Sequence, residues 1–529
     1  MERSVTDVTS HIGRRRAWWG WGFEDAKLDA RAMAPFVRET LGFGGDDVRD
    51  PVPLDDVALR PPRVDVPAQR PWSTDPRDRL EHALGRSYLD TVRGFAGVVE
   101  HPPDAVAFAR SEDDVERVLE WAAAEDVAVI PFGGGTSVVG GVEPRVPAEY
   151  TGAVSLDLSG MDRVLEVDPV SRAARVQAGP SGPRLEAQLA EHGMTMRFFP
   201  QSFELSTLGG WIATRAGGHF ATLWTHVDEL VESIRAITPS GAWESRRLPG
   251  SGAGPSPDRM LLGSEGILGV ITEAWVRVQP RPQHRAARAV RFGDFLGGAD
   301  AVRALAQSGL HPSNCRLVDA FEAQQTGAGD GTHALLVLGF ESTDHPVDHL
   351  LDRGLAICRE HGGVADQPSP DGPGAVGAWR SAFLAMPYLR DALLQLGVMS
   401  DTFESAITWD RFPAFHAAVT GATRAALGEP CRVTCRFTHV YPDGPAPYFT
   451  VLAPIRRGDE VPQWEEMKLA ASDAILAAGG TITHHHAVGR DHRPWYDLQR
   501  PDPFAAALRA AKAAVDPAGI LNPGVLVGP

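Results

Sequence analysis

The sequence predicts an α+β protein of two domains, and three observations support this. Its 529 residues correspond to about three and a half units of ~150 residues, which excludes one small module. Segments with helical spacing of apolar residues alternate with short runs typical of strands. The charged stretch 281–290, RPQHRAARAV, interrupts this alternation. We therefore expect an arm over 1–94, a first domain over 95–282, a second over 283–480, and a C-terminal segment over 481–529 that returns to the active site.

Composition excludes several classes of protein. The formal net charge is −17, opposite in sign to that of most proteins that bind nucleic acid. Hydrophobic residues make up 43% of the chain, enough for large cores. Four cysteines are too few for a disulfide framework, which favours a reducing compartment. The apolar runs fall short of the ~20 residues that span a bilayer, so we expect a cytoplasmic protein, with peripheral contact to the inner face of the membrane left open.

The N-terminal arm combines RRRAWWGWGFEDAKLD with a proline-rich stretch that lacks helical and strand periodicity. Its basic residues lie beside Trp18, Trp19 and Trp21, a pattern compatible with a nucleic-acid stacking patch or a membrane-surface anchor. Acidic neighbours and the negative net charge favour a third interpretation, in which the arm packs on the rest of the protein.

The first domain begins with a helix over residues 111–126. Its apolar residues recur at helical spacing, and Ser111 is followed three residues later by Asp114, a variant of the capping box. The remaining elements are expected as strands at 127–132, 164–168, 173–179 and 269–280, and as a helix over 183–193 that ends at a glycine.

The second domain repeats the mixture of strands and helices. Strands are expected at 310–320 and 332–341, with a helix over 348–363. In PYLRDALLQL, leucines at i, i+4 and i+7 predict a further helix. The C-terminal segment then carries three consecutive histidines and a helix over 503–517.

A glycine-rich loop, PFGGGTSVVGG, follows the strand at 127–132. Consecutive glycines leave backbone N–H groups unobstructed, which suits a pyrophosphate. The loop is neither a Rossmann fingerprint, which would open directly into a helix, nor a P-loop, because the lysine is missing. A purely structural glycine turn is the alternative.

Two more glycine-flanked segments occur at 200–218 and 261–274, and three such loops suggest a long ligand wrapped by backbone. The series PxGGGTS, ELSTxGGWxxTRAGG and GSEGxLGVIT resembles the FAD-binding domain of the vanillyl-alcohol oxidase class of flavoproteins, over about residues 95–280. The resemblance implies a two-domain FAD-binding fold with a cap domain. It also implies cofactor-binding roles for Pro131, Phe132, Gly133, Gly134, Gly135, Thr136, Ser137, Pro200, Gln201, Ser202, Phe203, Glu204, Leu205, Ser206, Thr214, Arg215, Ala216, Gly217, Glu265, Gly266, Ile267, Leu268, Gly269, Val270 and Ile271.

Many members of this class tether the flavin through a histidine in the first loop. Here that loop reads GGGTS, without histidine or cysteine. We therefore expect FAD to be bound non-covalently.

The rest of the chain resembles the alkyldihydroxyacetonephosphate synthases, the enzymes of ether-lipid synthesis. The matching segments include WGWGFEDAKLD, NCRLVDA, CRFTHVYPDGPAPYFT and GGTITHHHAVG. This resemblance implies exchange of the acyl group of acyl-dihydroxyacetone phosphate for a fatty alcohol, through an adduct at flavin N5 and without net redox change. The family's usual glycine after the histidines is Ala487 here. The alternative is a FAD-dependent oxidase or dehydrogenase of a 2-hydroxy acid or alcohol.

The resemblance implies catalytic roles for Tyr448 and for His484, His485 and His486. A phenol beside a flavin can exchange a proton with substrate, although a core tyrosine is the alternative. In an extended chain His484 and His486 would share one face, with His485 opposite. Zinc is a rival reading of the triplet, but nothing nearby offers an obvious carboxylate or cysteine in ligand register, so we expect no metal.

Arg390 and Arg316 are the candidates for binding a phosphate, because a guanidinium fork meets phosphate oxygens in pairs. The alternative is a surface ion pair with Asp391 or Asp319, which are close in sequence. The expected partners are a phosphorylated small molecule or lipid and a fatty alcohol, and a homodimer is left open.

Overall fold

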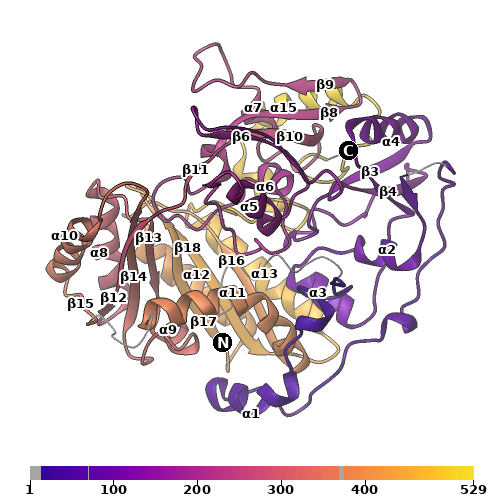
Figure 1. Cartoon of the computed structure of the whole chain (residues 1–529). Helices are drawn as coiled ribbons and strands as arrows, with labels where there is room; N and C mark the ends of the chain where they lie inside the picture. The colour runs from indigo at the N-terminus through magenta and orange to yellow at the C-terminus, as the bar shows by residue number, and fades with distance from the viewer. Residues whose placement is uncertain (1–13, 69–70, 368–373, 529) are drawn as a thin grey trace.

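The computed structural model describes residues 14–68, 71–367 and 374–528 (Figure 1). Within these residues the strands form sheets of four, five, two and seven strands. The four- and five-stranded sheets lie in the upper part of Figure 1, and the seven-stranded sheet lies below them. The predicted α+β class is confirmed.

The upper part contains the predicted glycine-rich loops. Its four-stranded sheet has the order β1 (Trp72–Ser73), β2 (Ala105–Phe108), β4 (Gly152–Asp157) and β3 (Val127–Phe132). Its five-stranded sheet has the order β5 (Val164–Asp168), β6 (Ala173–Gln177), β10 (Val270–Arg277), β8 (Val231–Thr238) and β9 (Gly241–Glu244). A two-stranded sheet of β7 (Met194–Thr195) and β11 (Gln279–Pro280) also belongs to the upper part. Its helices are α4 (Glu112–Ala124), α5 (Gly182–Ala190), α6 (Leu208–Thr214) and α7 (Asp258–Leu261), with a 3₁₀ turn η4 (Val227–Glu229).

The capping prediction for α4 is half right. The Ser111 side chain accepts a hydrogen bond from the Asp114 N–H at 3.3 Å. The Asp114 carboxylate accepts from the Arg110 N–H at 2.9 Å, and not from the Ser111 N–H that would close a capping box. Because Ser111 satisfies an N–H of the first turn, the helix starts where the sequence places it.

The lower part is built on one antiparallel sheet. Its order is β15 (Val364–Ala365), β12 (His284–Phe292), β14 (Ala334–Ser342), β13 (Asn314–Val318), β17 (Arg432–Val440), β18 (Pro445–Pro454) and β16 (Val398–Glu404). Its helices are α8 (Phe295–Gln307), α9 (Ala320–Gln325), α10 (Asp348–Glu360), α11 (Gly374–Gln395), α12 (Phe412–Leu427) and α13 (Glu460–Ala477). Residues of α8, α10, α12 and α13 share one hydrophobic cluster with this sheet.

One predicted boundary is itself a structural element. The charged stretch 281–290 overlaps β12, which pairs with β14 over its whole length. Its arginines recur at every third position, as Arg285, Arg288 and Arg291, and the adjacent Ala289 and Val290 are both buried. The sequence of β12 therefore lacks the period of two that marks a half-buried strand, which is why local periodicity did not reveal it. The domain limits at 94, 282 and 480 stay predictions.

The N-terminal arm packs against the body of the protein. Trp18, Trp19 and Trp21 are buried, which rules out a free stacking patch. The arm also contains elements that the sequence did not predict: η2 (Glu24–Ala26), α1 (Ala30–Leu41), η3 (Leu54–Asp56), α2 (Pro76–Glu81) and α3 (Tyr88–Phe95). Helix α1 packs its apolar side against residues of α11, including Leu393.

The C-terminal segment contributes α14 (Arg493–Gln499) and α15 (Asp502–Val515) and then returns to the upper part. Leu521 forms a parallel bridge with Val129 of β3. The Asn522 side chain donates to the Glu265 carbonyl at 2.8 Å. Among the described residues, no helix combines the length and the apolar character needed to cross a bilayer.

We predict that Asp391→Ala releases the arm. The buried Asp391 carboxylate forms an ion pair with Lys27 and accepts from the Trp21 N–H at 2.7 Å. Removing one partner of a buried pair costs about 3–5 kcal/mol, so trypsin should cleave the arm faster, as followed by mass spectrometry. Asp50→Ala breaks an exposed pair with Arg31, which is worth at most about 1 kcal/mol, removes no trypsin site and serves as the control. Equal cleavage of the two variants would contradict the prediction.

Candidate active site

A cavity of about 540 Å³ lies between the glycine-rich loops and the seven-stranded sheet. Most of its walls come from the loop after β3, the segment around α6, residues 265–271, the face of the sheet formed by β13, β16, β17 and β18, and helices α1 and α11. Histidines of the C-terminal segment complete the lining. The volume is in the range of small-molecule and cofactor sites.

Strand alternation makes the seven-stranded sheet two-faced. On β17 and β18, Arg436 and Tyr448 line the cavity, while Phe437 and Phe449 point into the helix-covered core. This follows from the period of two in a strand. A register shift between Phe437 and His439 interrupts the alternation, so His439 also lines the cavity.

The loop after β3 is shaped for close approach of backbone. Gly135 has a φ of +62°, a left-handed conformation that glycine adopts without strain. A Cβ on Gly134 would overlap the carbonyl of Leu205. These glycines line the cavity and leave a surface without side chains, which fits the pyrophosphate of a dinucleotide.

Most predicted cofactor-binding residues line the cavity. They are Pro131, Phe132, Gly133, Gly134, Gly135, Thr136, Ser137, Pro200, Gln201, Ser202, Ser206, Thr214, Ala216, Gly217, Glu265, Gly266, Gly269 and Ile271. The others, which are absent from the lining, are Phe203, Glu204, Leu205, Arg215, Ile267, Leu268 and Val270.

The exceptions have structural partners elsewhere, and their cofactor-binding roles stay predictions. Ile267, Leu268 and Val270 are buried in hydrophobic clusters. Glu204 accepts from the Tyr388 hydroxyl at 2.6 Å, and Arg215 pairs with the buried carboxylate of Asp228. Phe203 and Leu205 are packed in apolar clusters as well.

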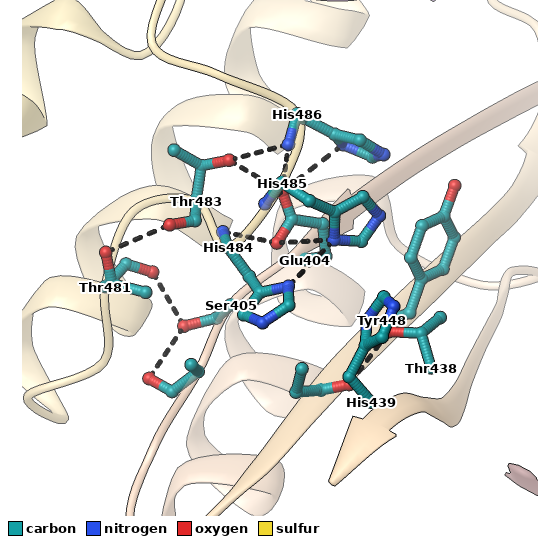
Figure 2. A network of polar contacts seen from close by, with 12 residues as sticks. Glu404, Ser405, Thr438, His439, Tyr448, Thr481, Thr483, His484, His485 and His486 are labelled. Atoms are coloured by element: carbon teal, nitrogen blue, oxygen red, sulfur yellow. Dashed lines mark hydrogen bonds and ion pairs between the residues drawn. The ribbon is translucent and has the colours of Figure 1, made fainter. Parts of the chain in front are cut away.

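The three consecutive histidines wrap around one buried carboxylate (Figure 2). Glu404, at the end of β16, accepts hydrogen bonds from the N–H groups of His484, His485 and His486 at 2.5, 3.2 and 2.9 Å. The Thr483 hydroxyl donates to it at 2.6 Å. Burial opposes ionisation of Glu404, but His486, His484 and these hydrogen bonds lower its pKa to about 2. The carboxylate is therefore ionised and holds the turn.

This turn overturns the expected extended arrangement. His485 and His486 line the cavity, whereas His484 does not. His484 instead lies within hydrogen-bond distance of His226, with 3.0 Å between Nε2 atoms, and of the Tyr441 hydroxyl at 2.7 Å. An extended chain would have paired His484 with His486, but three N–H groups converging on Glu404 require a tight turn.

Tyr448 lies beside the cavity-facing histidines. Its ring stacks on that of His485, with centroids 6.0 Å apart, and meets His486 edge-on at 5.4 Å. The hydroxyl donates to Thr402 Oγ1 at 2.9 Å. Burial raises the pKa of Tyr448, with Arg436 opposing, and burial lowers that of His485 well below its usual range. The pair therefore combines a protonated phenol with a neutral imidazole.

Both predicted phosphate-binding arginines line the cavity. Arg316 is buried, and burial with nearby Arg436 lowers its pKa to about 9. Arg390 donates to the Arg86 carbonyl at 2.5 Å, while its buried Nε has no hydrogen-bond partner among the residues that the structure describes. The neighbouring aspartates have other contacts, since Asp391 pairs with Lys27 and Asp319 caps α9. Asp391 and Asp319 therefore do not form the surface ion pairs with Arg390 and Arg316 that were the alternative.

Sequence reasoning missed Glu404, Arg436 and His439. Arg436 lies 3.9 Å over the Tyr448 ring and pairs with buried Glu322 at 2.7 Å. The alternation around Tyr448 could have identified Arg436, since both lie in strand-like runs rich in apolar residues. No local signal distinguishes Glu404, because its partners lie some 80 residues later in the chain.

The histidine cluster is larger than the triplet. His439, His484 and His485 each bring one ring nitrogen within 4.8 Å of the others, a grouping formed from two distant segments of the chain and not visible in the sequence. The His439 Nε2 atom lies 3.0 Å from the Gly218 carbonyl, which fixes that ring's orientation. The expectation that no metal binds stays a prediction.

Comparisons with known proteins follow the same division of the chain. Residues 103–245 match the model of an FAD binding domain, and residues 281–526 match that of the C-terminal domain of FAD linked oxidases. The chain is 29% identical to alkyldihydroxyacetonephosphate synthase of Dictyostelium discoideum, over 95% of this chain and 89% of that protein. It is 28% identical to the enzyme of the same name from Trypanosoma brucei brucei, over 99% and 94%. A solved structure of an alkyldihydroxyacetonephosphate synthase has a TM-score of 0.79 at 25% identity, covering 96% of this chain and 98% of that one.

FAD is the cofactor that these comparisons support, and the cavity fits it. The side-chain-free wall at Gly134 and Gly135 suits the pyrophosphate. Buried Glu265 lines the same cavity, and burial raises its pKa to about 7. Its carboxylate accepts from the N–H groups of Val488 and Gly489 at 2.9 and 2.8 Å, which joins the cofactor half to the histidine turn.

We predict that the stabilising effect of Glu404 depends on pH. Its folded-state pKa is depressed to about 2 from 4.5, so its contribution is complete above pH 4.5 and is lost as pH falls toward 2. The wild type should be more stable than Glu404→Gln at neutral pH, and about 2 of the roughly 3 kcal/mol of that advantage should be lost by pH 3. Urea unfolding at pH 3 to 7 measures the difference.

The matched control is Glu466→Gln, which removes an exposed carboxylate paired with Arg456. Its stability relative to the wild type should hardly change over the same range. A Glu404→Gln difference that stays constant from pH 3 to 7 would show that folding does not shift the pKa of Glu404, and would contradict the prediction.

Proposed function

We propose that this protein exchanges the acyl group of acyl-dihydroxyacetone phosphate for a fatty alcohol. The premise is that the chain belongs to the FAD-binding flavoproteins and is similar over nearly its whole length to alkyldihydroxyacetonephosphate synthases. The observation that carries this proposal is the composition of the cavity. One wall is a glycine cradle, one carries arginines, and one is apolar. A substrate with a phosphate and a long hydrocarbon chain would contact the arginine wall with its phosphate and the apolar wall with its chain, beside a flavin on the glycine wall.

The charged wall supports binding of a phosphorylated substrate. Arg316, Arg390 and Arg436 all line the cavity, while Glu322 is the carboxylate paired with Arg436. The chain as a whole carries −17 and would repel a phosphate at long range, so local cations must dominate inside the cavity. We propose that Arg390 and Arg316 bind the phosphate.

The apolar wall supports binding of a fatty chain. Met33, Val37 and Leu41 of α1 pack with Leu389 and Leu393 of α11 in one apolar cluster, and all five line the cavity. Phe36 also lines it and is 60% exposed. We propose that a fatty alcohol enters here, and that peripheral membrane contact, if it occurs, is made beside Phe36. A homodimer stays a prediction from the resemblance.

When bound, FAD supplies the reactive ring through which the acyl and alkyl groups are exchanged. The chain's own residues bind the phosphate, exclude water and handle protons. Tyr448 holds a proton on its hydroxyl, and neutral His485 offers a nitrogen that can accept one. The alcohol loses its O–H proton and the fatty acid leaves as a carboxylate, so each exchange releases one proton near neutral pH.

The direct test supplies acyl-dihydroxyacetone phosphate with a radiolabelled fatty alcohol and follows label in the ether product. Formation of labelled ether by the wild type and its loss in Tyr448→Phe would support the proposal. Steady reduction of the flavin by a 2-hydroxy acid, without ether formation, would replace it with the oxidase or dehydrogenase alternative.

We predict that the flavin is bound without a covalent link, because the loop from Gly133 to Ser137 contains no histidine or cysteine. Acid precipitation of the yellow protein should leave all the FAD in the supernatant, as measured by its absorbance. Flavin that stays with the pellet after washing in denaturant would contradict this.

We predict that Arg390→Ala weakens binding of dihydroxyacetone phosphate more than that of dihydroxyacetone. Loss of a charge-assisted bond to a buried phosphate costs roughly 1.5–3 kcal/mol, or about one to two decades in Kd. Calorimetric titration of both ligands measures the difference. Arg390→Lys should recover only part of it, because an ammonium lacks the fork. Arg456→Ala, on an exposed ion pair, is the control, and equal losses for both ligands would remove Arg390 from the phosphate site.

A further inference from the structure

His484 is the histidine of the triplet that does not line the cavity, and its hydrogen bonds run in two directions. Its Nδ1 lies 3.0 Å from Nδ1 of His485, which lines the cavity. Its Nε2 lies 3.0 Å from Nε2 of His226, which does not. We propose that His485, His484 and His226 form a proton relay that carries the proton released by the exchange from the cavity to the outside. The relay's purpose rests on the proposed function.

Three imidazoles linked by hydrogen bonds can pass a proton from His485 through His484 to His226 when each ring carries its proton on the nitrogen that faces the next ring. With the proton of His485 on Nδ1, donated to Nδ1 of His484, the Nε2 of His485 is free to accept a proton in the cavity. His484 then carries its proton on Nε2 and donates it to Nε2 of His226, whose own proton sits on Nδ1. When His485 accepts a proton at Nε2, each ring passes one on, and Nδ1 of His226 releases one. One proton enters, one leaves, and the three rings exchange tautomers.

The electrostatics suit a relay of neutral rings. Burial is the largest cause lowering the pKa of His484 and of His485 well below the usual range, and it also lowers that of His226. None of the three therefore stores a positive charge at neutral pH. Glu404 fixes the backbone of His484 and His485, so the Nδ1 to Nδ1 contact is held without further ordering.

The outer end of the relay reaches the surface. His226 is partly exposed and lies between buried Thr225 and Val227. The exposed Glu229 accepts hydrogen bonds from the N–H groups of Thr225 and His226, so an acceptor for the departing proton lies beside it. The Tyr441 hydroxyl is a second neighbour of His484 Nε2 at 2.7 Å, but burial raises the pKa of that phenol. His226 is therefore the better exit.

The test is His226→Gln in the holoenzyme, assayed for alkyl exchange in weak buffer. Glutamine can keep a hydrogen bond to His484 but cannot pass a proton on. We expect kcat to fall roughly tenfold or more with KM unchanged, and added imidazole to restore it. His333→Gln, on an exposed histidine paired with Asp330, is the matched control and should keep wild-type rates in both buffers. Wild-type kcat in His226→Gln, or a loss that imidazole does not restore, would overturn the relay.

A second measurement is independent of turnover. In protein labelled with ¹⁵N-histidine, NMR should show His485 protonated on Nδ1 and His484 on Nε2, and His226→Gln should leave both unchanged. The opposite tautomer of His485 would overturn the relay. So would one tightly bound divalent ion per chain that is lost in His439→Gln, because it would occupy the nitrogens that must carry protons. If the wild type forms no ether product, the proposed function fails, and the relay is then judged by NMR alone.

Discussion

The buried carboxylate of Glu404 is the constraint on which the arrangement of the site depends. It accepts hydrogen bonds from three consecutive N–H groups of the C-terminal segment. Glu404 itself stands opposite Tyr448 in the register of β16 and β18. One ionised side chain therefore fixes the histidine turn and sets its distance from the tyrosine. Because an unpaired carboxylate in this position would be costly, the C-terminal segment must be in place for the seven-stranded sheet to be stable.

A second carboxylate holds the next residues from the opposite side. Glu265 belongs to the upper part of the molecule and accepts from the N–H groups of Val488 and Gly489. Between the two carboxylates lies Ala487, whose φ of +73° is unusual for a residue with a Cβ. The structure tolerates this strain because hydrogen bonds on both sides fix the backbone. The C-terminal segment thus connects the cofactor-binding half to the half that carries Tyr448.

The seven-stranded sheet separates two environments with one sequence pattern. One face contributes Phe437 and Phe449 to the core beneath the helices, and the other presents Arg436 and Tyr448 to the cavity. Arg436 is neutralised by Glu322, so its cost of burial is reduced. The cavity nevertheless retains Arg316 and Arg390, which gives it a positive character inside an acidic protein. Long-range repulsion and short-range attraction of an anion therefore coexist.

The sequence by itself determined the elements whose signals are local. Strand β3 has the predicted limits, α4 begins at its predicted cap, and the three glycine-flanked segments supply most of one cavity wall. Family resemblance added Tyr448, the histidines and the two arginines as candidates. The charged sequence of β12 has no period of two and hid that strand. The arm was taken as irregular, although Ala30, Ala34, Val37 and Leu41 of α1 fall at helical spacing on the side that packs against α11.

Only the tertiary structure decided how the site is assembled. It turned the histidine triplet around Glu404, placed His484 against His226, and brought His439 into the cavity through an irregularity in β17. These contacts join residues separated by about 80 to 260 positions. A local sequence pattern reports which face of a strand or helix is apolar, because that depends on neighbours along the chain. Which buried carboxylate meets which N–H groups depends on how distant segments pack, and no local periodicity records it.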